Sequence, residues 1–106
     1  MSHALDTLFA TIAARKAAGD ADASYTARLL KDGVAKCAKK FGEEAVETAL
    51  AAVSGDKTEL AAESADALYH LMVLWAAAGI TPEDVYAVLK SRESQSGLAE
   101  KASRKS

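Results

Sequence analysis

The stretch KCAKKFGEEAVETALAAV, Lys36–Val53, decides the fold of this 106-residue chain. Its apolar residues recur at intervals of three and four, which predicts one long helix over residues 34–53. Gly55 follows the last of these residues, as expected at a helix end, and a second periodic segment covers residues 57–78. Because the connection between the two is short, we expect an antiparallel helical hairpin.

Three further helices are predicted on either side of the hairpin. Apolar residues at helical spacing predict an amphipathic helix over residues 4–18. Ser24 is placed to cap a short helix that Gly33 ends, and Thr81 with Pro82 begins the last one. About a quarter of the chain is alanine, the best helix former, and there is one proline. The composition and periodicity therefore predict an all-α fold of about five helices.

The chain length predicts a single domain, residues 1–94, followed by a polar, basic tail over residues 95–106. From Leu71 onward the second hairpin helix reads LMVLWAAA and is apolar on every side. A helix that is hydrophobic all round must be enclosed, and one short chain has few elements with which to enclose it. We therefore expect a helical bundle that is completed by homodimerisation.

The overall charge and the cysteine count exclude several classes of protein. A net charge of −2 provides no field to attract nucleic acid or an anionic membrane. Cys37 is the only cysteine, and with only His3 and His70 beside it the sequence argues against a structural zinc site. The apolar run Leu8–Ala14 is too short for a membrane span and lacks the basic lead-in of a signal peptide. We expect a cytoplasmic protein without nucleic-acid or membrane partners.

Four acidic residues are spaced to form a metal site. Glu44 and Glu47 are three residues apart on the first hairpin helix, and Glu63 and Asp66 have the same spacing on the second. If the pairs face each other, four carboxylates surround one small volume, and such a group must protonate, meet bases or bind a cation. Oxygen ligands without cysteine or histidine favour Mg²⁺, with Mn²⁺ as a substitute. The alternative is that these acids form solvated helix faces.

Basic residues beside the acids indicate a phosphate-containing substrate. Lys40 and Lys36 lie one and two turns before Glu44 on the same helix face, where they could reach phosphate oxygens. Glu43 lies about 100° around the helix from Glu44, and its role is open. It could act as a general base, as an outer partner of the metal or as the ion-pair partner of a lysine. The expected substrate-binding residues are Lys36, Lys39, Lys40, Arg28 and Lys31.

The acidic pattern, Glu43-Glu44-x-x-Glu47 followed by Glu63-x-x-Asp66, resembles the EExxE…ExxD motif of the all-α nucleoside triphosphate pyrophosphohydrolases, the MazG and dimeric dUTPase group. More specifically, the chain resembles the phosphoribosyl-ATP pyrophosphohydrolase family from about Leu5 onward. The stretches that carry this resemblance are SYTARLL, GxxKxxKKFGEEAVE, DALYHLMVLWAAAGI and SGLAEKASRK.

The resemblance implies a stand-alone, Mg²⁺-dependent dimer that hydrolyses phosphoribosyl-ATP to phosphoribosyl-AMP and pyrophosphate, the second step of histidine biosynthesis. It also implies that the metal ligands, by matching position, are Glu44, Glu47, Glu63 and Asp66. The expected catalytic set is Glu43, Glu44, Glu47, Glu63 and Asp66.

Three other interpretations compete with this one. A house-cleaning nucleoside triphosphate pyrophosphohydrolase would use the same acids on another nucleotide, and a non-catalytic helical dimer would use them for solubility or regulation. A carboxylate di-iron bundle calls for Glu-x-x-His pairs, whereas here Asp66 follows Glu63 at that spacing.

The sequence leaves two roles open for Tyr69 and His70. Either side chain could contact a base or ribose of the substrate, or it could pack in the core.

Overall fold

The structure, a computed structural model, describes residues 3–93, and all the regular elements in that range are helices. The all-α class is confirmed. The proposed domain boundary after residue 94 and the basic tail lie outside the described residues. The helices are α1 (Ala4–Ala18), α2 (Tyr25–Asp32), α3 (Val34–Ser54), α4 (Lys57–Ala78) and α5 (Pro82–Arg92).

Local capping interactions set the helix ends where the sequence predicts them. The Ser24 hydroxyl accepts a hydrogen bond from the Ala27 amide at 3.1 Å, which caps α2. Thr81 and Asp84 form a reciprocal capping box at the start of α5. Gly55 has a φ of 83°, a left-handed conformation that residues with a Cβ rarely adopt, so the chain reverses directly after α3.

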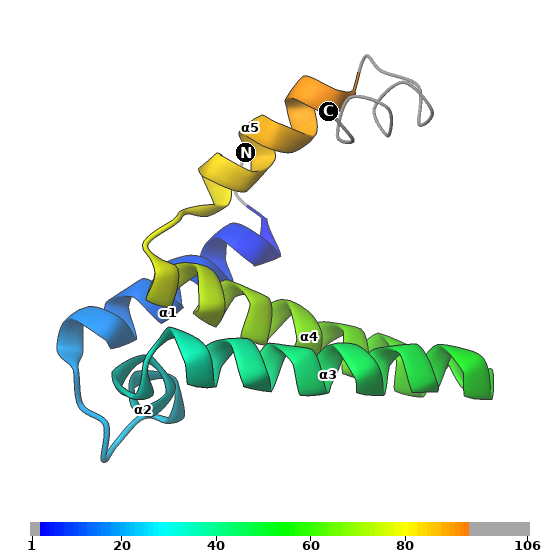
Figure 1. Cartoon of the computed structure of the whole chain (residues 1–106), viewed down its shortest axis with the longest axis horizontal. Coiled ribbons are helices and arrows are strands. Elements are labelled where there is room, and N and C mark those ends of the chain that lie inside the picture. The colour runs from blue at the N-terminus through cyan, green and yellow to red at the C-terminus, as the bar shows by residue number, and fades with distance from the viewer. Residues whose placement is uncertain (1–2, 94–106) are drawn as a thin grey trace.

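α3 and α4 form the long antiparallel hairpin to which the other helices attach (Figure 1). α1 and α2 pack at the end of the hairpin where α3 begins and α4 finishes, and α5 projects away from it. The half of the hairpin that leads to the turn at Gly55 is not covered by another helix among the described residues.

The apolar core lies at the end of the hairpin that α1 and α2 cover. Ile12, Leu29, Cys37, Met72 and Val73 are almost completely removed from solvent there. Such burial stabilises each of the larger side chains by about 1.5–3 kcal/mol relative to exposure. The core therefore anchors one end of α3 and α4, while their other ends depend on contact with each other.

α5 has few contacts with the other helices. Its Tyr86 hydroxyl donates a hydrogen bond to the Asp6 carboxylate of α1 at 3.1 Å.

Among residues 3–93 no single helix has the length and apolar character of a membrane span. Taken together, α4 and α5 reach that length and composition, but the pair is bent by 109°.

We expect Ile12→Ala to destabilise the protein by about 2–5 kcal/mol, because it leaves a cavity among fully buried core residues. Thr11→Ala is the matched control, since the neighbouring Thr11 is exposed on the same helix and its replacement should change stability by no more than about 0.5 kcal/mol. Urea unfolding monitored by circular dichroism measures the change in stability of each variant. Equal losses of stability in Ile12→Ala and Thr11→Ala would contradict this location of the core.

Candidate metal centre

Carboxylates from two helices converge midway along the hairpin. Glu44 of α3 and Glu63 and Asp66 of α4 each offer one oxygen, and these three oxygens all lie within 4.8 Å of one another. Glu44 and Glu63 are half-buried, whereas Asp66 is exposed. The antiparallel packing of the hairpin thus brings together acids that are about twenty residues apart in sequence, in an arrangement that one cation could bridge.

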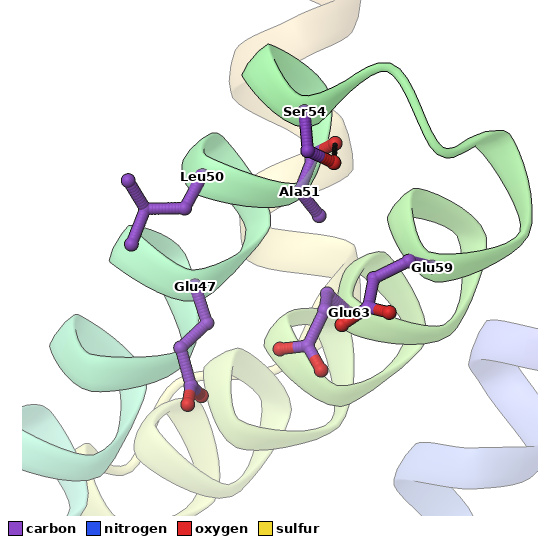
Figure 2. Close-up of a pocket in the computed structure, with 6 residues that line it drawn as sticks. All are labelled: Glu47, Leu50, Ala51, Ser54, Glu59 and Glu63. Carbon is purple, nitrogen blue, oxygen red and sulfur yellow. Dashed lines mark hydrogen bonds between the residues drawn. The ribbon is translucent and has the colours of Figure 1, made fainter.

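Glu47 lies beside this group, at the edge of a hollow of about 280 Å³ near the turn of the hairpin. Figure 2 shows the Glu47 and Glu63 carboxylates turned toward the space between α3 and α4, with Glu59 close to Glu63. Leu50, which also lines the hollow, points away from α4. Glu47 is thus next to the converging oxygens and borders solvent from which a ligand could approach.

The surroundings make two of these carboxyls hard to ionise. Burial raises the pKa of Glu44, and its hydrogen bond with Glu47 and the negative charges of Glu47, Asp66 and Glu63 raise it further. Burial also raises the pKa of Glu63, and the charges of Glu47, Asp66 and Glu59 act in the same direction. Each of these causes favours the protonated form, and a bound cation would oppose them.

The residues present fit a hard divalent cation. Glu63 Oε2 is buried and has no hydrogen-bond partner among the described residues, which is unusual for a carboxylate oxygen. A cation held by Glu44, Glu63 and Asp66 would satisfy that oxygen and offset the repulsion within the group. Carboxylate ligands without sulfur or imidazole match the preference of Mg²⁺ and Mn²⁺.

Lys40 is the one predicted substrate-binding cation that the structure places against the acids. Its Nζ lies 3.2 Å from Glu43 Oε1, so Glu43 makes an ion pair with a lysine. Lys40, Glu43, Glu44 and Glu47 line a second hollow, of about 450 Å³, along α3. Glu47 borders both hollows, which places an ammonium group and the candidate metal-binding carboxylates along one continuous stretch of surface.

The other predicted substrate-binding residues lie in different places. Lys36 is exposed on α3, and Lys39 points roughly 140° around that helix from Glu44. On α2, the Arg28 side chain donates to the Ala21 carbonyl at 3.4 Å. Lys31 faces the end of α1, where it lines a separate hollow together with Lys16. Their roles in substrate binding stay predictions.

His70 continues the acidic face of α4 into the core, one turn beyond Asp66. It is only 6% exposed, and its Nδ1 is buried without a hydrogen-bond partner among the described residues. Burial lowers its pKa, the charge of Lys40 lowers it further, and Asp66 and Glu43 act in the opposite direction. The ring packs edge-on against Tyr69, with centroids 4.9 Å apart. His70 is therefore a core residue that adjoins the candidate site.

Glu59 and Thr48 also lie at this group of acids, although the acidic motif includes neither. Glu59 lines the same hollow as Glu47 and Glu63, and its position four residues before Glu63 would have indicated a shared helix face. The Thr48 hydroxyl donates to a main-chain oxygen on each of the two hairpin helices. No spacing rule along the sequence predicts such a contact between helices.

Comparison with known proteins assigns the chain to a family. The family model described as phosphoribosyl-ATP pyrophosphohydrolase matches residues 5–93. A phosphoribosyl-ATP pyrophosphatase of Azospirillum brasilense is 60% identical over 102 residues, covering 96% of this chain and 91% of that protein. A protein of the same name from Parvibaculum lavamentivorans is 62% identical over 94% of this chain and 91% of its own length. Another from Ruegeria pomeroyi is 54% identical over 94% of both chains.

The raised carboxyl pKa values predict a pH-dependent stability of the metal-free protein. In the folded state Glu63 keeps its proton at pH values where the unfolded chain, with a pKa near 4.5, has released it. Its contribution to stability therefore becomes unfavourable as pH rises from that value through the raised folded pKa. In EDTA, Glu63→Gln should gain stability relative to the wild type across this window, as measured by thermal unfolding.

In saturating Mg²⁺ the wild type should instead be more stable than Glu63→Gln, because a cation stabilises the wild type through the carboxylate that the variant lacks. Glu83→Gln serves as the control, since Glu83 is an exposed acid on α5, outside the cluster. If Glu63→Gln unfolds at the same temperature as the wild type at every pH, with and without Mg²⁺, this electrostatic description is contradicted.

Proposed function

Because this chain belongs to the phosphoribosyl-ATP pyrophosphohydrolase family, within the helical MazG-like superfamily, we propose that it hydrolyses phosphoribosyl-ATP to phosphoribosyl-AMP and pyrophosphate. This reaction is the second step of histidine biosynthesis. The convergence of the Glu44, Glu63 and Asp66 carboxylates between α3 and α4 carries the proposal, because such a group can hold a divalent cation that assists hydrolysis of a phosphoric anhydride.

Glu44, Glu63 and Asp66 would hold the cation, with Glu47 beside them as the fourth predicted ligand. Mg²⁺ is the expected metal and Mn²⁺ a substitute, since both accept carboxylate and phosphate oxygens. When bound, the metal neutralises charge on the phosphate oxygens and lowers the pKa of water. Glu44 and Glu47 share a proton in the metal-free protein, and a bound cation would take the place of that proton.

Lys40 would bind the phosphate chain of the substrate. An ammonium group has three donors, so Lys40 can keep its ion pair with Glu43 and still donate to phosphate oxygens in the neighbouring hollow. Glu43 would then act by orienting Lys40. Lys36, on the same side of α3, would extend this cationic surface. The phosphate chain would lie farther from the observed positions of Arg28, Lys31 and Lys39.

A homodimer is the proposed assembly. Val46, Leu50 and Val53 form an apolar stripe on α3 at spacings of four and three, and Leu50 and Val53 are 63% and 86% exposed. Such a stripe on the half of the hairpin that no other helix covers is suited to pack against a second copy. We further expect a nucleotide as the small-molecule partner, no nucleic-acid or membrane partner, and a cytoplasmic location.

Asp66→Asn and Glu47→Gln should each lower Mg²⁺-dependent release of pyrophosphate from phosphoribosyl-ATP by more than about 100-fold, because each removes a ligand charge rather than an outer contact. Circular dichroism should report a folded protein in both cases, and Glu83→Gln should keep the wild-type rate. Full activity in either ligand variant would refute the ligand assignment.

A panel of phosphoribosyl-ATP and deoxynucleoside triphosphates distinguishes the two pyrophosphohydrolase functions. Faster turnover of the deoxynucleotides by the wild type would favour the house-cleaning activity. No pyrophosphate from any member of the panel would favour a non-catalytic helical protein.

Light scattering should give the wild type a mass of twice the 11.0 kDa chain. Leu50→Glu should produce monomers at the same concentration, since it places a charge in the apolar stripe. Ala14→Glu, which adds the same charge on the exposed side of α1, is the matched control. A monomeric wild type, or a dimeric Leu50→Glu variant, would argue against this surface.

A further inference from the structure

The Thr48 hydroxyl joins the main chains that carry two of the candidate metal ligands. Thr48 is half-buried on α3, one turn after Glu44. Its Oγ1 lies 2.8 Å from the Glu44 carbonyl oxygen on the same helix and 3.0 Å from the Glu63 carbonyl oxygen on α4. Both distances suit hydrogen bonds, so the hydroxyl donates a proton that these two carbonyls share.

Within residues 3–93, the bond from Thr48 to Glu63 is the sole hydrogen bond between α3 and α4, and no ion pair joins these helices. On α3 near the acids, Ala51 is buried and Ala45 is half-buried, and neither has a polar side chain. Apolar contact is not directional, whereas a hydrogen bond fixes the relative position of the two atoms that it joins. Thr48 therefore supplies a directional contact that fixes the axial register of the hairpin at the acidic group.

Removal of this hydroxyl should leave the fold intact. In an α-helix the Glu44 and Glu63 carbonyls each already accept a hydrogen bond from the amide four residues further on. The hydroxyl uses their second lone pairs, so its loss leaves neither carbonyl without a partner. Meanwhile the carboxylates of the two helices repel each other, and that repulsion acts against the register that Thr48 holds.

We propose that Thr48 is a positioning residue of the metal centre, whose hydroxyl holds α3 and α4 in the register that lets carboxylates of both helices bind one cation. This role rests on the proposed metal-dependent hydrolysis. Thr48 contacts neither metal nor substrate; it acts through the main chain of Glu44 and Glu63.

Thr48→Val tests the proposal, because it removes the hydroxyl while keeping the shape of the side chain. Isothermal titration calorimetry with Mg²⁺ or Mn²⁺ alone should show affinity reduced on the order of tenfold, at the lower end of the effect of groups that orient metal ligands. The Mg²⁺ concentration for half-maximal pyrophosphate release should rise by a similar factor, with kcat at saturating Mg²⁺ within about twofold of the wild type. Thr48→Ser, which keeps the hydroxyl, should restore both quantities.

Thr11→Val is the matched control. Thr11 makes the same kind of bond to the carbonyl four residues before it, at 3.1 Å to Thr7, but lies exposed on α1 and has no acceptor on another helix in the described part of the chain. It should bind metal as the wild type does. If Thr48→Val fails to fold in circular dichroism, Thr48→Ala, which also lacks the hydroxyl, provides the comparison.

Wild-type metal affinity in a folded Thr48→Val or Thr48→Ala variant would overturn the role of Thr48 and leave the proposed reaction in place. Equal weakening by Thr48→Ser would also overturn it, since the hydroxyl would then not be responsible. Conversely, a wild type that binds Mg²⁺ but releases no pyrophosphate from phosphoribosyl-ATP would refute the proposed reaction, while calorimetry would still decide on Thr48.

Discussion

The packing of α3 against α4 positions all the candidate metal ligands, because Glu44 and Glu47 come from one helix and Glu63 and Asp66 from the other. Neither helix could assemble the group alone, since Glu44 lies on α3 whereas Glu63 and Asp66 lie on α4. The left-handed Gly55 and the cap at the start of α4 make the two helices antiparallel neighbours. A shift of one helix along the other would separate the oxygens without unfolding either helix.

The two halves of this hairpin have opposite physical character. Ile12, Leu29, Met72 and Val73 enclose one half in an apolar core. In the other half, carboxylates approach one another, and burial raises the pKa of Glu44 and Glu63. The core thus stabilises the same two helices that carry this group of mutually repelling acids. A cation that binds the folded state would offset this repulsion, so metal binding and hairpin stability are thermodynamically linked.

Much of the fold follows from local signals. Ser24 and Thr81 begin helices and glycines end them at the predicted positions, because caps and backbone preferences act over four or five residues. The positions of the cations do not follow in the same way. Lys31 lies on the side of α2 that faces α1, which depends on how α2 rotates when it packs. That rotation is set by contacts distant in sequence.

The sequence by itself determined the helices, the acids that serve as candidate ligands, and the family resemblance, because periodicity, capping and spacing are properties of one continuous stretch. The tertiary structure alone decided which oxygens converge, and that Thr48 reaches the main chain of α4. These depend on the rotation and axial register of two packed helices. Contacts between the two helices, the Thr48 hydrogen bond among them, set that register, and no spacing within either helix contains it.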